Sequence, residues 1–342
     1  MNFLERAWLK KAAWLHALRP LAWIFQVIGH YRKKIQRPAI RPQSHAVPVI
    51  VIGNISVGGT GKTPLLIALA KRFIEQGIRP GIISRGYGGS APDYPLTVTA
   101  ATAVDSCGDE ALLMVQGTGC PLVVDPDRES ALRCLLENAS VDVILSDDGL
   151  QHYRLHRDIE IAVVDGQRLF GNRLCLPAGP LREPVSRLQS VDHIIINGEV
   201  NSELAELKSA TTMALIPRFL INLGNGEKRP FAGAPFSMGN KIQAVSAIGN
   251  PERFYQLLDK LPYQLEKFSF RDHHLFSESD FEDRGIDMQQ PVVMTEKDAV
   301  KCRQFAMPNF WYLSVDVQLQ QEFLDPLLER LKQLREHQAT AR

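Results

Sequence analysis

The sequence lacks the marks of several common protein classes. Its five cysteines are scattered, with no C-x-x-C pair and no histidine at ligand spacing, which excludes a disulfide scaffold or a zinc-folded domain. We expect reduced thiols in a cytosolic compartment. No run of about 18 uncharged apolar residues occurs, so no membrane-spanning helix is indicated. Lysine and arginine number 39 against 38 aspartate and glutamate, so the net charge gives no reason to expect a nucleic-acid partner.

The overall amino-acid composition is that of a folded globular protein. The chain has 342 residues, 45% of them hydrophobic and 23% charged, and this length exceeds what one hydrophobic core supports, so we expect two domains. Continuous apolar runs alternate with helical patterns, which predicts an α/β fold with a doubly wound, mostly parallel sheet. The expected strands are 49–55, 81–84, 141–146, 159–164 and 193–197, and the expected helices are 64–76, 110–116 and 129–138.

The stretch 217–241 is rich in glycine and proline and loses the periodic pattern, so it predicts a domain boundary. We divide the chain into an N-terminal segment, 1–41, a larger domain, 42–220, and a smaller α/β domain, 221–342. In the smaller domain we expect strands at 242–248, 264–270 and 291–295, a helix at 251–261, and a closing charged helix at 320–338.

Residues 1–41 hold nine basic residues and one acidic residue, a charge of about +8. Arg19-Pro20 interrupts the apolar pattern, so we expect two short helices rather than one span. Three of the four tryptophans fall here beside basic residues, a combination typical of helices that lie on an anionic membrane surface. The alternative is a helix whose apolar face caps the main domain. The local basic excess favours membrane contact.

The apolar run 49–55 leads directly into the segment SVGGTGKT, and a helical pattern follows it. Glycines allow successive backbone N–H groups to point at a polyphosphate, Lys62 can reach the β- and γ-phosphates, and the Thr63 hydroxyl can ligate Mg²⁺. The usual pattern opens with glycine where this sequence has Ser56. A glycine-rich turn without a ligand is the alternative, but strand, GKT and helix agree, which makes 42–220 a P-loop nucleotide-binding domain. The predicted nucleotide-binding residues are Ser56, Val57, Gly58, Gly59, Thr60, Gly61, Lys62 and Thr63.

A second apolar run ends in Asp147-Asp148-Gly149. A carboxylate there lies at the same sheet edge as the loop and can hold Mg²⁺ directly or through water. Asp147 is the first candidate and Asp148 the second, because adjacent side chains at a strand end point to opposite sides. A solvated Asp-Asp-Gly turn is the alternative.

Seven motifs in order resemble the tetraacyldisaccharide 4'-kinase family: GNISVGGTGKTP (53–64), SRGYGG (84–89), GDE (108–110), SDDGLQH (146–152), PAGPLREP (177–184), RDHH (271–274) and TEKDAVK (295–301). The resemblance covers nearly the whole chain, and Ser56 fits the family's pattern. It implies ATP- and Mg²⁺-dependent phosphorylation of the 4'-hydroxyl of a tetraacyl glucosamine disaccharide 1-phosphate, the lipid A precursor. It also implies a peripheral or monotopic protein at the cytoplasmic face of the inner membrane.

A sugar hydroxyl is a poor nucleophile, so such a site needs a group that accepts its proton. Asp109 is the candidate, and the resemblance implies that it pairs with a histidine of the second domain, His273, with His274 left open. Bringing the two together requires domain closure. From the residues alone, Asp109 caps a helix and His273 lies in a loop. Lys62 completes the predicted catalytic set.

Other residues of the motifs are assigned by their place in the sequence. Glu183 is predicted as a further Mg²⁺ contact, with an exposed loop charge as the alternative. The predicted contacts of the acceptor or the phosphates are Arg85, Tyr87, Gln151, His152 and Arg182. The segment 295–298 either meets the nucleotide or only caps the next helix.

Two other functions fit parts of the pattern. A membrane-associated P-loop ATPase switch would carry a second lysine before the glycine pair, where this sequence has Val57. A soluble small-molecule P-loop kinase would not need the tryptophan-rich basic N-terminus. A lipid acceptor would indicate the tetraacyldisaccharide 4'-kinase function, whereas a soluble acceptor would indicate a small-molecule kinase.

Overall fold

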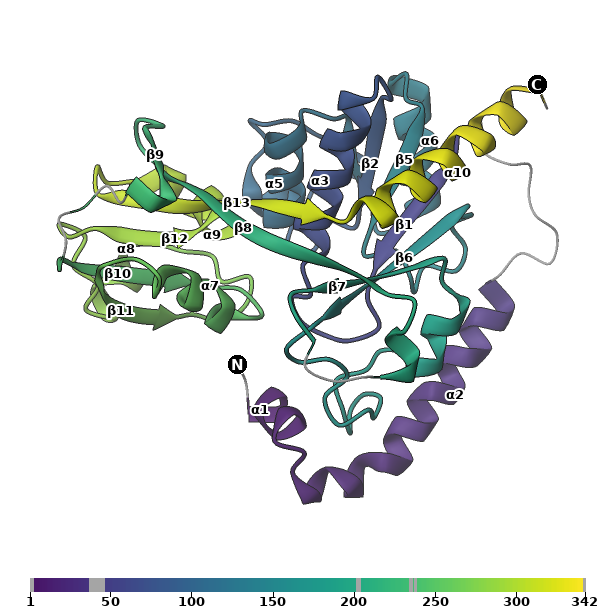
Figure 1. Cartoon of the computed structure of the whole chain (residues 1–342), viewed down its shortest axis with the longest axis horizontal. Coiled ribbons are helices and arrows are strands. Elements are labelled where there is room, and N and C mark those ends of the chain that lie inside the picture. The colour runs from purple at the N-terminus through teal and green to yellow at the C-terminus, as the bar shows by residue number, and fades with distance from the viewer. Residues whose placement is uncertain (1–2, 37–46, 201–203, 234–235, 237–238, 341–342) are drawn as a thin grey trace.

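The computed structural model describes residues 3–36, 47–200, 204–233, 236 and 239–340. Within them a 13-stranded sheet runs through the whole molecule (Figure 1). The strands are β1 (Val49–Gly53), β2 (Pro80–Ser84), β3 (Leu96–Val98), β4 (Leu122–Val124), β5 (Val143–Asp147), β6 (Ile159–Asp165), β7 (His193–Asn197), β8 (Thr211–Asn222), β9 (Lys228–Pro230), β10 (Lys241–Ser246), β11 (Gln264–Ser269), β12 (Val292–Thr295) and β13 (Phe310–Leu319). Their order is β11-β10-β12-β13-β8-β7-β6-β1-β5-β2-β4-β3, and β9 pairs with β8.

The first half of the sheet, which consists of strands β1 to β7, is doubly wound. All residues of β1 are buried, and its neighbours β5 and β6 run parallel to it. Ile50 and Ile52 face one hydrophobic core while Val49 and Val51 face another on the opposite side of the sheet. Because both faces are covered, the strand reads as a continuous apolar run, and the predicted fold class is confirmed. The helices of this half are α3 (Lys62–Glu75), α4 (Val104–Cys107), α5 (Asp109–Thr118) and α6 (Arg128–Asn138), with 3-10 turns η2 (Val185–Ser190) and η3 (Ala205–Leu207).

The second half of the sheet, which consists of strands β10, β11 and β12, repeats the parallel pattern on a smaller scale. β10 lies between β11 and β12, parallel to both, and separate hydrophobic clusters cover the two faces of this part of the sheet. The three strands expected here are therefore confirmed to within a few residues. The helices are α7 (Pro251–Leu258), α8 (Glu278–Asp283) and α9 (Glu296–Cys302), with 3-10 turns η4 (Phe231–Gly233) and η5 (Arg303–Phe305).

Two long antiparallel strands, β8 and β13, connect the halves (Figure 1). They pair from Trp311 opposite Asn222 to Leu319 opposite Met213. The stretch 217–241 that we expected to separate the domains begins inside β8, and its residues 234–235 and 237–238 lie outside the described part of the chain. The domain limits themselves stay a prediction.

The C-terminal helix α10 (Gln321–Thr340) packs on the first half. The expectation that this helix closes the smaller, second domain is therefore wrong. Its buried Phe323, Leu327 and Leu331 join the core that contains Leu65 and Leu69 of α3. The physical reason is that β13 runs back along β8 and delivers the chain beside α3.

The N-terminal segment begins with α1 (Phe3–Leu9) and a 3-10 turn, η1 (Ala13–Leu18), and continues as α2 (Arg19–Gln36). The structure does not interrupt the chain at Arg19-Pro20 as expected: η1 ends at Leu18 and α2 begins at once with a helical Arg19, because proline is tolerated in the first turn of a helix. Trp8 and Leu15 are buried beside Val57, whereas α2 leaves most of its large apolar residues exposed. Among the described residues, no helix meets the length and hydropathy needed to cross a bilayer. Residues 37–41 of the predicted segment lie outside the described part.

Candidate active site

The loop between β1 and α3 has the backbone of a phosphate-binding loop. Gly58 and Gly61 both adopt a φ of 97°, a left-handed conformation that favours glycine. Asn197 fixes the loop because its Nδ2 donates to the Thr60 carbonyl at 3.0 Å, and a Cβ on Gly61 would lie 2.3 Å from that nitrogen. Lys62 is the first residue of α3, so its side chain leaves the helix N-terminus beside the loop.

The start of the loop is anchored from the other side. Val57 N donates to the Pro180 carbonyl at 2.8 Å, and Ser56 forms an isolated β-bridge with Leu181. The motif that contains PLRE therefore lies against the phosphate loop. Of the eight predicted nucleotide-binding residues, Ser56 to Gly61 form the loop after β1, and Lys62 and Thr63 begin α3.

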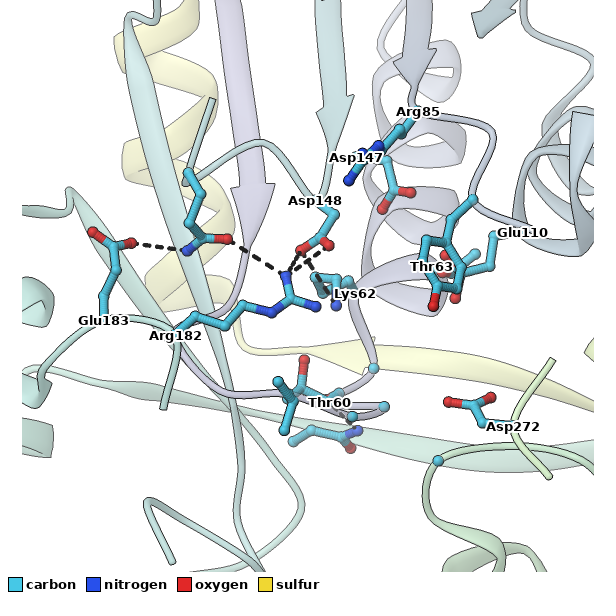
Figure 2. Close-up of a pocket in the computed structure, with 18 of the residues that line it drawn as sticks. Thr60, Lys62, Thr63, Arg85, Glu110, Asp147, Asp148, Arg182, Glu183 and Asp272 are labelled. Atoms are coloured by element: carbon cyan, nitrogen blue, oxygen red, sulfur yellow. Dashed lines mark hydrogen bonds and ion pairs between the residues drawn. The ribbon is translucent and has the colours of Figure 1, made fainter. Parts of the chain in front are cut away.

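The two aspartates at the end of β5 have different environments, as Figure 2 shows. Asp148, at a φ of 46°, lies 3.6 Å from Lys62 Nζ, and Arg182 Nη1 donates to both its oxygens at 3.1 and 2.8 Å. Burial raises the pKa of Asp148, but Lys62 and Arg182 outweigh burial and hold the pKa well below its usual range. Asp148 is therefore an ionised carboxylate that forms ion pairs with two cations, Lys62 and Arg182.

Asp147 is buried on the other side of the strand end. Its Oδ2 accepts from Ser84 Oγ at 3.2 Å, whereas its Oδ1 has no hydrogen-bond partner among the described residues. Burial, followed by the charges of Glu110 and Asp148, raises the pKa of Asp147 to about 7. A nearby cation would relieve this accumulation of negative charge.

Glu183 lies on the opposite side of the site from Thr63 and Asp147 (Figure 2). Its carboxylate accepts from Gln151 Nε2 at 2.8 Å and from the Tyr153 hydroxyl, and Arg187 Nε lies 3.5 Å away. The structure thus gives this carboxylate a set of protein partners on the side of the site away from Thr63 and Asp147 (Figure 2). Its role as an Mg²⁺ contact stays a prediction.

Asp109 and His273 meet although 164 residues separate them. Asp109 begins α5, and its Oδ1 lies 3.0 Å from Nδ1 of His273, which follows β11 at a φ of 60°. The N-cap of α5 is Gly108, and no side chain caps this helix, which removes the capping alternative for Asp109. His274 points elsewhere: its Nε2 lies 3.0 Å from Asp280 Oδ1 and its ring stacks on Phe270.

The environment of Asp109 favours the charged carboxylate. The side chain is only 4% exposed. Burial raises its pKa, but the hydrogen bond from His273 and the charges of Lys297 and Lys301 lower the pKa to about 2. Asp109 is therefore ionised at neutral pH despite being buried.

The remaining predicted contacts line the same cavity. The Tyr87 ring stands edge-on to His273, with centroids 4.7 Å apart, and Arg85 is exposed at the end of β2. Gln151 Nε2 also donates to the Asn54 carbonyl at 3.0 Å. Burial and the charges of Arg128 and Arg85 lower the pKa of His152 to about 4, so its imidazole is neutral at pH 7.

Sequence reasoning missed four charged residues of this site. Glu110 and Lys297 lie 2.9 Å apart between α5 and α9, and Lys301 Nζ lies 3.6 Å from Asp109 Oδ2. Arg128 Nη2 donates to the Asp147 carbonyl at 3.1 Å. The first three stand inside GDE and TEKDAVK, so their signal was a charged residue within a quoted motif. Arg128 carried no such signal.

One cavity of about 1350 Å³ is lined by most of these groups, while Asp109 and Lys301 lie buried behind its wall. The phosphate loop and the Asp147-Asp148 pair line it from the first half, and His273, Lys297 and the loop at Gly249 line it from the second. Part of α2, from Trp23 to Lys33, also lines it. Carboxyl ends of parallel strands from both halves thus face one space, the position in which open α/β sheets bind ligands.

A phosphate loop, strand-end carboxylates and a carboxylate–imidazole pair in one cavity define the class of a P-loop phosphotransferase. The chain belongs to the tetraacyldisaccharide-1-P 4'-kinase family, whose model matches residues 14–332. The tetraacyldisaccharide 4'-kinase of Pseudomonas fluorescens (strain Pf0-1) is 46% identical over 312 residues, 89% of this chain and 90% of that one. The protein of the same name from Aeromonas hydrophila is 45% identical over 331 residues, 96% of each chain.

A solved structure resembles the whole fold. LpxK from Aquifex aeolicus in complex with ATP has a TM-score of 0.72 and 27% identity, and the match covers 93% of this chain and 99% of that one. The family resemblance expected from the seven motifs is confirmed.

Proposed function

We propose that this chain transfers the γ-phosphoryl group of ATP to the 4'-hydroxyl of a tetraacyl glucosamine disaccharide 1-phosphate, the lipid A precursor. The observation that carries the proposal is the Asp109–His273 pair, in which the imidazole lines the cavity that contains the phosphate loop and the carboxylate lies buried behind it. A phosphate loop alone serves many NTPases, whereas a buried base beside it suits a kinase with an alcohol acceptor. The family names the acceptor.

The residues of the first half are suited to ATP and Mg²⁺. Backbone N–H groups of the loop and Lys62 would hold the β- and γ-phosphates, and Thr63 and Asp147 would hold the metal. The fit rests on Asp147, whose buried Oδ1 is without a hydrogen-bond partner in the described structure. Bound Mg²⁺ would neutralise charge that develops on the transferring phosphoryl oxygens.

The described residues contain no group of three or more His, Cys, Asp or Glu side chains arranged to hold a metal ion. This suits Mg²⁺, which proteins usually bind through one or two side chains while phosphates and water complete the octahedron. Lys62 and Arg182 keep Asp148 ionised beside this position.

The proton of the acceptor hydroxyl must leave as the new P–O bond forms. Asp109 is a buried, ionised carboxylate, and His273 is within hydrogen-bond distance of it, so the two can share that proton. Tyr87 packs against the His273 ring and restricts its orientation.

The exposed face of α2 supports a site on a membrane surface. Trp23, Ile28 and Tyr31 are 67%, 54% and 64% exposed, and Arg32 and Lys33 follow them on the same helix. Apolar side chains beside cations suit the boundary between acyl chains and anionic headgroups. Since α2 also lines the cavity, we place the protein on the cytoplasmic face of the inner membrane, with the lipid acceptor entering along α2.

The test is transfer of label from γ-labelled ATP to a tetraacyl disaccharide 1-phosphate in detergent, with Lys62→Ala as the inactive control. A soluble glucosamine disaccharide is the competing acceptor. Transfer to the lipid acceptor that Lys62→Ala abolishes is the expected result. Transfer to the soluble acceptor only would favour the soluble kinase, and ATP hydrolysis without transfer to either would favour an ATPase.

A further inference from the structure

Two lysines of α9 face the Asp109–His273 pair from the second half. Lys297 Nζ lies 2.9 Å from Glu110 Oε1, 3.3 Å from His273 Nε2 and 3.9 Å from Asp109 Oδ2. Lys301, one turn later, lies 3.6 Å from the same Asp109 oxygen. The lysines are 16% and 1% exposed, so water screens these interactions poorly.

The position of α9 is fixed by its own first turn. Thr295 is the N-cap, and its Oγ1 accepts from Asp298 N and donates to Asp298 Oδ2 at 2.6 Å. The same carboxylate accepts from Ala247 N at 3.0 Å and lies 2.8 Å from Lys301 Nζ through its other oxygen. The segment 295–298 therefore does cap a helix, and the cap anchors Lys301 against Asp109.

Asp109 and Lys297 together determine which nitrogen of His273 carries the proton, because an ionised carboxylate can only accept from Nδ1. An ammonium group has three donors and no acceptor, so its hydrogen bond to Nε2 must run from lysine to the ring. Nε2 is then unprotonated, and Nδ1–H donates to Asp109. A protonated Nε2 would bring two donors together at 3.3 Å.

From these contacts we infer that Lys297 and Lys301 are positioning residues of the transfer reaction. Lys301 keeps the Asp109 carboxylate charged inside the protein, and Lys297 donates to Nε2 of His273 and so keeps that nitrogen unprotonated while Nδ1–H donates to Asp109. The inference rests on the proposed function only in its activity measurements, because the tautomer can be observed without any acceptor.

The charged or titratable groups around Asp109 come from four segments. They are Cys107 of α4, Glu110 of α5, Asp272 and His273 after β11, and Lys297, Asp298 and Lys301 of α9. Only the lysines bring a permanent positive charge. Removing either should make Asp109 easier to protonate, and a protonated Asp109 cannot accept a proton from the hydroxyl.

The test compares Lys297→Met and Lys301→Met with the unmodified chain, since methionine keeps the length of the side chain without the charge. We expect each variant to lose turnover by about 10- to 100-fold, with KM for ATP changed by less than about threefold. The acidic limb of the kcat/KM profile should move up by about one to three pH units. Lys301→Arg should recover most of the turnover.

Lys71→Met is the matched control. Lys71 is exposed on α3. Burial raises the pKa of Glu296 and the charge of Lys71 opposes that rise, yet the structure gives Lys71 no contact with Asp109. Its turnover and pH profile should match those of the unmodified chain. If Lys71→Met moved the acidic limb of the kcat/KM profile by the same amount, the shift would follow from the loss of any positive charge and not from the contacts with Asp109. The inference would then fail.

NMR of isotope-labelled histidine reports the tautomer, with His273→Gln assigning the signal. The unmodified chain should show a protonated Nδ1 and an unprotonated Nε2, and Lys297→Met should show Nε2 protonated in a larger share of the molecules. An unchanged tautomer together with wild-type kcat and pH profile would overturn the inference. If Lys301→Met does not fold, the Lys297→Met tautomer and profile decide alone. If the unmodified chain does not phosphorylate the lipid acceptor, but Lys297→Met still changes the protonation of His273 as expected, then the proposed acceptor is wrong and the inference about Lys297 stands.

Discussion

Changing Asp109 to asparagine removes one negative charge from the candidate active site with almost no change in volume. The carboxylate lies between His273 Nδ1 at 3.0 Å and Lys301 Nζ at 3.6 Å. An amide cannot accept a proton, so turnover should fall about 10²- to 10⁴-fold. KM for ATP should change by less than about threefold, because a base acts in the transition state rather than in ATP binding.

The same variant has a calculable effect on stability. Burial opposes ionisation, but His273, Lys297 and Lys301 lower the pKa of Asp109 from 3.8 to about 2. A shift of this size corresponds to about 2 kcal/mol of folding free energy. Because the folded pKa is depressed, this contribution is fully present above about pH 4 and is lost as the pH falls through 2.

Label transfer to the lipid acceptor measures the first effect, and urea unfolding at several pH values measures the second. The difference in unfolding free energy between the parent chain and Asp109→Asn should be about 2 kcal/mol at pH 7 and should shrink below about pH 4. Wild-type turnover in Asp109→Asn would refute the assignment of Asp109 as the proton acceptor. A stability difference independent of pH would refute the electrostatic explanation of its pKa.

Three further predictions address other parts of the site. Lys62→Ala should lower turnover by about a hundredfold or more with an unchanged circular dichroism spectrum, and an active variant would contradict the phosphate-loop assignment. Glu183→Gln should lower the free energy of unfolding by about 1–3 kcal/mol, because Tyr153 and Arg187 lose a charged partner, while the Mg²⁺ concentration for half-maximal rate stays the same. A shifted Mg²⁺ dependence would support the metal role instead. Replacing Trp23 and Ile28 with serine should weaken binding to anionic vesicles at all salt concentrations, as centrifugation can measure, and unchanged binding would remove α2 from the membrane.

The parts of the site that sequence alone predicts are built from contiguous residues. The phosphate loop lies between β1 and α3, and Asp147 ends β5, so strand, turn and helix signals locate both within a few residues. The Asp109–His273 pair is different, because no local pattern joins residues 164 apart. That pairing followed from the family resemblance alone.

The stretch expected to contain the domain boundary overlaps a strand, although the domain limits themselves stay a prediction. Proline and glycine from residue 217 onward indicated a linker, yet β8 continues through Pro217 to Asn222. The pairing with β13 shifts register between Ser314 and Val315, opposite this proline, and a β-bulge is a place where a strand tolerates proline. Sequence periodicity cannot show that a distant strand supplies such a partner.

The charges of α9 were missed for a related reason. Lys297 and Lys301 are one helical turn apart, which in isolation describes an exposed basic face. Only the packing of α9 on α5 turns that face toward Asp109 and Glu110. Burial, which gives these lysines their influence, is a property of the assembled halves.

The phosphate and proton parts of the site are also linked through the backbone. Gly249, in the loop after β10, touches the phosphate loop so closely that a Cβ on it would lie 2.5 Å from Gly59 N. Two residues earlier, the Ala247 carbonyl accepts from His273 N at 3.3 Å. The loop after β10 therefore packs against the phosphate loop and also accepts a hydrogen bond from the backbone of His273. One short segment of the chain thus joins the phosphate-binding part of the site to the residue that carries the imidazole, a contact that no local sequence pattern indicates.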